Sequence, residues 1–322
     1  MKQVLIDNNI EAIAQDYKNL FEKDCKTEIL SSINLLLKNL DIKDQEYAIK
    51  KIYLENIIIN YSLILTLRPD EMIIFFSKFI LPPLDKNFYK DIVSSMRYDI
   101  VRKKYMLLYV KKLEINCCAY CHTQNTNIVN EYYKRAHNGN KKGDIKNQKG
   151  FFELDHYYPK SRYPFLCTSF YNLIPICSSC NKSKKDKSID FEFYHISKMI
   201  QHGFKFRITK NSIIKYKTTL NKNDIEIDFY HPNKKYLEKY NNLFSIQLKY
   251  SEFKDIAEEL IYKEMKYNDI YVKSVINTFG NNQLDPSLTK RIILGNYCED
   301  DEVLKRPLAK FYQEIGLQLK II

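Results

Sequence analysis

The fold is decided by three short stretches of sequence, Cys118-Ala-Tyr-Cys121, Glu153-Leu-Asp-His156 and Cys177-Ser-Ser-Cys180-Asn181. Zinc in structural sites takes four thiolate or imidazole ligands in a tetrahedron, and one Cys-x2-Cys turn brings two thiolates to one ion. Two such turns predict a single zinc site. Because 55 residues separate them, we expect a small subdomain between the turns, held together by the metal. The predicted zinc ligands are Cys118, Cys121, Cys177 and Cys180.

Neighbouring residues leave alternatives open at this site. Cys117 competes with Cys118 as a ligand, and His122 could replace a missing thiolate. The alternative without metal is a set of buried free thiols with accidental spacing. The sequence contains eight cysteines and begins without an apolar signal segment, which indicates a reducing compartment, and we expect the protein to be cytoplasmic.

The composition indicates a folded, basic protein. Of its 322 residues, 45% are hydrophobic and 28% are charged, and glycine is scarce, which favours helices over turn-rich sheets. The formal net charge is +12, so nucleic acid is the first partner to consider. The excess is densest in residues 114–190, which carry 12 basic and 7 acidic side chains. The apolar runs Ile57–Leu67 and Met72–Leu84 are too short and interrupted to span a bilayer, so we expect no membrane segment.

Hydrophobic periodicity predicts an α+β protein that is mostly helical. Apolar residues recur at three- and four-residue steps in residues 1–113, which predicts a helical N-terminal domain. Residues 114–190 are expected to form the zinc-stapled module. Residues 191–322 are expected to begin with a small antiparallel meander and to continue as helices.

Proline, glycine and charged residues predict where the N-terminal elements begin and end. We expect a break at Asp41–Asp44. A helix should begin at Pro69, after an extended Arg68, and end at Pro82–Pro83. The last helix of this region should run from Phe88 to Leu113. Residues 123–150 are polar and lack apolar periodicity, which predicts a long loop.

Further elements are expected along the rest of the chain. Strands are predicted at Phe151–Leu154 and Leu173–Ile176, and a helix from Ser178 toward Gly203. The meander should have three strands, and helices should follow from Pro232 to Phe279. A final helix with Pro307 in its first turn should bury Leu308, Phe311, Ile315 and Leu319. The three predicted strands of the meander are residues 204–208, 213–216 and 225–229.

An Asp-His pair at the end of a strand can serve the hydrolysis of a phosphodiester. Adjacent side chains there can point apart, so Asp155 can face a hard cation while His156 faces a water molecule. This chemistry needs a base with a near-neutral pKa and a cation that stabilises charge on the phosphorus and the leaving oxygen. The pair supplies the base and one ligand for the cation.

In this order, the cysteines, the Asp-His pair and two asparagines resemble the HNH nuclease motif of the His-Me finger (ββα-metal) superfamily, in its four-cysteine zinc form. The resemblance covers Cys118 to Lys184 and implies a ββα-metal module in a metal-dependent endonuclease that cleaves DNA. It implies that His156 is the general base and that Asn172 braces the loop that presents it. It also implies that Asp155 and Asn181 bind a catalytic Mg2+ or Mn2+. Many members have a histidine where this chain has Asn181, and an amide favours hard cations.

Basic residues close to the motif are candidates for phosphate contacts, with a solvated surface as the equally weighted alternative. They are Lys160, Arg162, Lys184 and Lys185.

A looser resemblance concerns partners. The stretches 158–161, 169–175, 293–296 and 306–310 are similar to a bacterial subgroup of HNH proteins that are often encoded beside an ATPase, as in Septu-type and retron-associated anti-phage systems. This implies an ATPase partner and a role in antiviral defence. Two other functions stay open: a zinc-stapled nucleic-acid-binding or assembly module without catalysis, and an RNA-cleaving toxin, since the same chemistry can attack either sugar.

Overall fold

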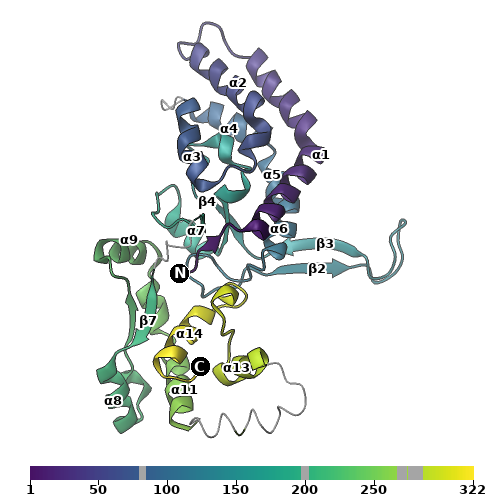
Figure 1. Ribbon diagram of the computed structural model, residues 1–322. Coiled ribbons are helices and arrows are strands. Elements are labelled where there is room, and N and C mark those ends of the chain that lie inside the picture. Colours follow the sequence, from purple (N-terminus) through teal and green to yellow (C-terminus); the bar gives the residue numbers. More distant parts are fainter. Residues whose placement is uncertain (80–84, 197–202, 267–273, 275–285) are drawn as a thin grey trace. The chain divides into compact units, whose positions relative to one another are not determined.

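The computed structural model forms two compact units, each with helices and small sheets (Figure 1). The prediction of an α+β fold that is mostly helical is confirmed. The predicted domain boundaries after residues 113 and 190 stay predictions. The N-terminal unit comprises Gln3–Glu114 and Thr126–Ile200, and the C-terminal unit comprises Met1–Lys2, Ile115–Asn125 and Gln201–Ile322. The residues that the structure describes are 1–79, 85–196, 203–266, 274 and 286–322.

The first part of the N-terminal unit is helical, as predicted. The break expected at Asp41–Asp44 is confirmed, because one helix ends before it and the next begins after it. Pro69 begins a helix after an extended Arg68, also as predicted. The helix end expected at Pro82–Pro83 lies outside the described residues. The helical elements are α1 (Asn8–Lys38), α2 (Tyr47–Ile64), α3 (Pro69–Phe75), η1 (Phe76–Lys78), α4 (Lys86–Ser95), α5 (Tyr98–Ile100), the π-helical η2 (Val101–Tyr105) and α6 (Met106–Lys112).

The single helix predicted from Phe88 to Leu113 is wrong. Arg97 adopts a left-handed backbone conformation with a φ of 56°, so one helix ends at Ser95 and another begins at Tyr98. Neither glycine nor proline marks this position in the sequence. Periodicity alone therefore did not reveal the break.

Three two-stranded sheets lie among the described residues of the N-terminal unit. The strand predicted at Leu173–Ile176 is confirmed, and the one predicted at Phe151–Leu154 begins two residues later, so that it contains Asp155 and His156. The long loop predicted for residues 123–150 is wrong, because most of it forms an antiparallel hairpin. The pairs are β2 (Ile128–Tyr132) with β3 (Ile145–Gly150), β4 (Glu153–His156) with β5 (Leu173–Ile176), both antiparallel, and β1 (Val4–Leu5) with β6 (Tyr194–His195), parallel.

The helix predicted from Ser178 toward Gly203 is shorter than expected. Helix α7 (Ser178–Lys184) ends because Lys185 adopts a positive φ of 49°, and the chain then continues to β6. Together, β4, β5 and α7 form a compact group of two strands and one helix, in which α7 contacts β4.

Aromatic residues fix the segment between β4 and β5 against the helices. Phe165 stacks on Phe79 with ring centroids 3.9 Å apart. The hydroxyl of Tyr17 in α1 donates a hydrogen bond to the Thr168 carbonyl at 2.6 Å. The helices thus position the Cys167 backbone, which lies between these two contacts. The segment contains the short 3-10 turns η3 (Pro164–Leu166) and η4 (Phe170–Asn172).

The C-terminal unit contains one two-stranded sheet among its described residues, not a three-stranded meander. Residues 213–216 belong to helix α8, whose first turn is capped by the Thr209 hydroxyl, 3.4 Å from the Ser212 nitrogen. The last helix begins at Ala309, so Pro307 precedes it and does not lie in its first turn. Phe311, Ile315 and Leu319 are buried as predicted, whereas Leu308 is only half-buried. The remaining elements are β7 (Lys205–Ile208), β8 (Ile227–Tyr230), α8 (Lys210–Thr219), η5 (Lys222–Asp224), α9 (Lys234–Phe244), α10 (Ile246–Ser251), α11 (Lys254–Lys266), α13 (Pro286–Leu294), η6 (Asp300–Glu302) and α14 (Ala309–Gln318). Of the described helices, none is long and hydrophobic enough to cross a bilayer.

Candidate metal centre and Asp-His site

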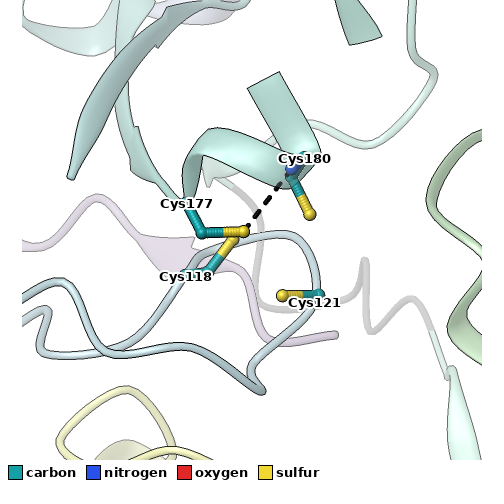
Figure 2. A group of neighbouring side chains, drawn as sticks. All are labelled: Cys118, Cys121, Cys177 and Cys180. Atoms are coloured by element: carbon teal, nitrogen blue, oxygen red, sulfur yellow. Dashed lines mark hydrogen bonds between the residues drawn. The ribbon is translucent and has the colours of Figure 1, made fainter. Parts of the chain in front are cut away.

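Four cysteine thiols converge on one point (Figure 2). Their sulfur atoms lie within 4.8 Å of one another, and all four side chains are buried. Four soft donors at this spacing can hold a metal such as zinc. The group consists of the four predicted ligands, Cys118, Cys121, Cys177 and Cys180.

Local hydrogen bonds shape each Cys-x2-Cys turn. Cys177 is the N-cap of α7, and its sulfur accepts a hydrogen bond from the Cys180 nitrogen at 3.5 Å. In the other turn, the Cys118 carbonyl accepts a hydrogen bond from the His122 nitrogen at 2.9 Å. The hydroxyl of Tyr250 donates to the Cys121 carbonyl at 2.9 Å. Hydrogen bonds to backbone groups therefore shape each turn.

The structure decides between the competing ligands. Cys117 is buried, but its sulfur lies 3.8 Å from the Val303 carbonyl and outside the cluster, and burial raises the pKa of this thiol. His122 is also buried, and its Nε2 accepts a hydrogen bond from the Lys2 nitrogen at 3.4 Å. Cys118, and neither of these neighbours, completes the group of four thiols.

Strand β4 sends its alternate side chains to opposite sides. Glu153 and Asp155 point to α7, where the Asn181 amide donates to the Glu153 carboxylate and the Lys184 ammonium donates to Asp155 Oδ1 at 3.0 Å. Glu153 and Asp155 are two residues apart and share one face of the strand. Their partners are three residues apart and share one face of the helix, so the two pairs can form side by side. His156 lies on the other side of the strand.

The ion pair between Lys184 and Asp155 is buried. The Lys184 side chain has no exposed surface, that of Asp155 is 4% exposed, and the ammonium also donates to the His156 carbonyl at 3.0 Å. Lys184 was a candidate for a phosphate contact, with a solvated surface as the equally weighted alternative, but in this structure it neutralises a carboxylate inside the protein. A buried pair of this kind is costly to break from one side, because the remaining charge stays desolvated.

The His156 ring is held by a backbone carbonyl. Its Nε2 lies 3.1 Å from the Cys167 oxygen, which can only accept, so Nε2 carries the proton and Nδ1 carries the lone pair of the neutral ring. The Tyr98 ring lies beside it at 4.8 Å, and the Lys160 ammonium lies 4.2 Å from the centre of the Tyr98 ring. Burial, and secondly the charge of Lys160, lowers the pKa of His156 to about 3. The imidazole is therefore neutral at physiological pH.

Asn172 connects the segments on either side of this histidine. It is fully buried and accepts a hydrogen bond from the Tyr158 nitrogen at 2.8 Å. Its amide donates to the Tyr158 carbonyl at 3.2 Å and to the Leu166 carbonyl at 3.0 Å. The turn after His156 is thus tied to the turn that contains its carbonyl partner.

The other predicted phosphate contacts differ in exposure. Arg162 and Lys185 are exposed, whereas Lys160 is half-buried, and burial lowers its pKa. Sequence reasoning missed Glu153 as the partner of Asn181. Its position two residues before Asp155, on the same face of a strand, was the available signal. No side-chain pattern could have indicated the Cys167 carbonyl, because a backbone group leaves none.

Comparison with known proteins found no matching family model, curated protein or solved structure. The chemistry available to the chain follows from its donors. Four buried thiols suit a structural metal, while a strand that presents carboxylates on one side and a neutral imidazole on the other suits acid–base chemistry.

Proposed function

We propose that the chain is a metal-dependent endonuclease that hydrolyses phosphodiester bonds of DNA. The observation that carries this proposal is the division of β4, with Asp155 on the side of α7 and a neutral, oriented His156 on the other. The resemblance of the motif to HNH nucleases supports the same function, with the four cysteines holding a structural zinc ion.

In this proposal, His156 acts as the general base. Its Nδ1 accepts a proton from the attacking water, while the Cys167 carbonyl fixes the ring and stabilises the imidazolium that forms. A pKa of about 3 makes the imidazole a weak base in the absence of substrate. The negative charge of a bound phosphate favours the protonated ring and therefore raises this pKa toward the working range.

The donors beside α7 fit a hard divalent cation. The carboxylate of Asp155 and the amide oxygen of Asn181 would hold it, and the Glu153 carboxylate lies against Asn181. Oxygen donors of this kind are what Mg2+ and Mn2+ prefer. When bound, the cation supplies stabilisation of the negative charge on the phosphate and the leaving oxygen. In the structure Asp155 is paired with the Lys184 ammonium, so a cation bound by this carboxylate would replace that ion pair.

One observation favours a competing function. Asp155 is already neutralised by Lys184, and His156 is only 6% exposed, so the pair is closed. A zinc-stapled nucleic-acid-binding module without catalysis needs neither an accessible base nor a free cation ligand, so buried and paired side chains suit it.

A plasmid-nicking assay separates the two functions. Wild-type protein should nick supercoiled DNA with Mg2+ or Mn2+ and not with EDTA, and His156→Ala should lose at least about 100-fold in rate. Cys167→Ala is the matched control, because it keeps the backbone carbonyl, and it should retain activity. Full cleavage by His156→Ala would contradict the base assignment, and no cleavage by the wild type would favour the binding module. A matched RNA substrate that is cut in preference to DNA would favour an RNA-cleaving toxin.

The proposed defence role and ATPase partner rest on the looser sequence resemblance. Affinity purification of the full chain from bacteria, followed by mass spectrometry, should recover an ATPase. Adding that ATPase to the nicking assay should change the rate of cleavage. Recovery of the chain alone would argue against the partner.

A further inference from the structure

The hairpin of β2 and β3 is solvent-exposed along its whole length. From Ile128 to Gly150 no residue is buried, and the ribbon projects from the end of α6 (Figure 1). The strands pair in antiparallel register from Ile128 opposite Gly150 to Tyr132 opposite Ile145. Two-stranded hairpins without a core are marginal in water. Burial of apolar surface therefore does not explain why this element is present.

The tip and the base of the hairpin are both well defined. At the tip, Asn138 and Gly139 have positive φ angles of 45° and 81°, the signature of a type I′ turn, and His137 and Asn140 exchange backbone hydrogen bonds of 3.1 and 3.0 Å. At the base, Gly150 packs so closely on α6 that a Cβ there would lie 2.7 Å from Leu107 Cδ2. The hairpin thus has a defined turn at its tip and is packed against α6 at its base, and we refer to residues 128–150 as the arm.

The arm is strongly basic at its outer end. Residues 128–150 carry six basic and two acidic side chains, a net charge of +4. Lys146 pairs with Glu131 at 2.6 Å, and Lys149 lies 5.3 Å from the centre of the Phe151 ring. The other four basic residues flank the turn, are exposed, and form no ion pair within the part of the chain that the structure describes. They are Lys134, Arg135, Lys141 and Lys142.

We propose that this hairpin is an arm that binds duplex DNA, with the four outer cations contacting phosphates. A two-stranded ribbon fits the major groove of B-form DNA, whereas the major groove of A-form RNA is too deep and narrow for it. Four unpaired cations repel one another until a polyanion neutralises them. The inference rests on the proposed function in one respect, that DNA is the substrate.

The length of the arm predicts where it contacts the substrate. Ten residues from Ile128 to the turn span at most about 33 Å, roughly one turn of duplex. The arm ends at Gly150, and the strand with the proposed base begins at Glu153. We therefore expect the contacts of the arm to lie within about one helical turn of the cleaved bond.

Binding to a 30-base-pair duplex in EDTA tests the arm without cleavage. The variant with Lys134, Arg135, Lys141 and Lys142 changed to Ala should lose at least tenfold in affinity at physiological salt. Its plot of log affinity against log salt should be shallower by about 3 to 4, since each phosphate contact contributes a slope of about 0.9. The control changes four exposed lysines of the helical region to Ala and alters net charge equally. It should lose far less affinity. These control positions are Lys23, Lys38, Lys43 and Lys90.

If the two quadruple variants lose equal affinity for DNA, or if the hairpin variant keeps the wild-type salt slope, the hairpin is not a DNA-binding arm. Duplex RNA bound as tightly as DNA, with the same dependence on the four cations, would also overturn the proposal. With a duplex of about 8 base pairs, the affinities of the wild type and the hairpin variant should differ by less than they do with the 30-base-pair duplex. An equal difference in affinity with both duplexes would contradict the predicted position of the contacts.

Cleavage assays separate failure of the arm from failure of the proposed nuclease. At low salt and saturating enzyme, the hairpin variant should cut at the wild-type maximal rate and need more enzyme to reach it. If the wild type does not cut DNA but the hairpin variant still loses affinity for it, the proposed nuclease function is wrong and the proposed DNA-binding hairpin is supported. If the wild type cuts DNA and the hairpin variant binds it with wild-type affinity, the proposed DNA-binding hairpin is wrong and the proposed nuclease function is supported.

Discussion

Two antiparallel two-stranded sheets of the N-terminal unit have the same backbone pairing and opposite surroundings. In β4 and β5, Glu153 is half-buried and every other residue is buried. In β2 and β3 no residue is buried. The buried sheet must satisfy its charged and polar side chains within the protein, as Lys184 does for Asp155. The exposed sheet can leave its cations to water, which keeps them available for an external anion.

The comparison separates two kinds of effect. Substitutions around β4 should appear first as a loss of folding free energy, because water cannot replace a lost partner there. Substitutions in the hairpin should leave the folding free energy nearly unchanged and should appear in binding.

Removal of a thiol from the α7 end of the buried group should have the largest effect. Cys177→Ser takes away one of four metal donors, while the serine hydroxyl can still accept the N-cap hydrogen bond of α7. Because a structural zinc site contributes many kcal/mol to folding, bound zinc should fall from about one per chain to near zero and the thermal midpoint by about 10 °C or more. Elemental analysis and calorimetry measure both. Cys117→Ser, a buried thiol outside the group, should keep its zinc; unchanged zinc in Cys177→Ser would end the metal assignment.

Two neighbouring lysines, one in the last turn of α7 and one just after it, give the next test. Lys184→Met removes the ammonium from the buried Asp155 carboxylate and should lower the free energy of unfolding by about 3–5 kcal/mol. Lys185→Met, at an exposed position, should change it by less than about 0.5 kcal/mol. Urea denaturation measures both values. Adding Asp155→Asn to Lys184→Met should recover part of the loss, and equal stabilities of the two lysine variants would show that the pair is not buried in solution.

The pH dependence of stability tests the surroundings of His156. Its pKa is about 3 in the folded protein and about 6.5 in an unfolded chain, so between these values the unfolded state binds more protons. The free energy of unfolding should therefore fall as the pH decreases through this window, by up to about 1.4 kcal/mol per pH unit from this residue. His156→Gln should remove that part of the slope between pH 6 and pH 4. Parallel curves for wild type and variant would mean that the imidazole is accessible to water.

The buried sheet was far easier to predict from sequence than the exposed one. Leu173–Ile176 is uniformly apolar between turns, and the doubled Cys-x2-Cys spacing indicated which thiols converge. Both patterns depend only on the type and spacing of neighbouring side chains, which the sequence gives directly. The capped helix at residues 210–219 was mistaken for a strand, because the run from Ile213 to Tyr216 also fits alternation and the cap at Thr209 was overlooked.

The partners inside the site were harder to predict because they depend on tertiary contacts. Nothing in the sequence shows that Lys184 turns inward to Asp155, since most lysines are exposed. For the hairpin, a local signal existed: Asn138-Gly139 is the commonest pair in a type I′ turn, although polar flanking residues hid the strands. An exposed sheet lacks the apolar alternation by which strands are usually recognised.

That turn also gives the smallest and most local prediction. Gly139→Val places a β-branched residue at a φ of +81°, which costs on the order of 1–2 kcal/mol, whereas Gly139→Asn puts there a residue that tolerates this conformation. Because nothing lies within 4 Å of the position, the cost is in the backbone alone. Hydrogen exchange of the β2 and β3 amides should accelerate about tenfold in the valine variant and little in the asparagine variant, while the thermal midpoint of both stays within about 1 °C of wild type. If the valine variant lowers the midpoint by several degrees, the hairpin contributes to the folded core, and the division between a sheet that stabilises and a sheet that binds does not hold.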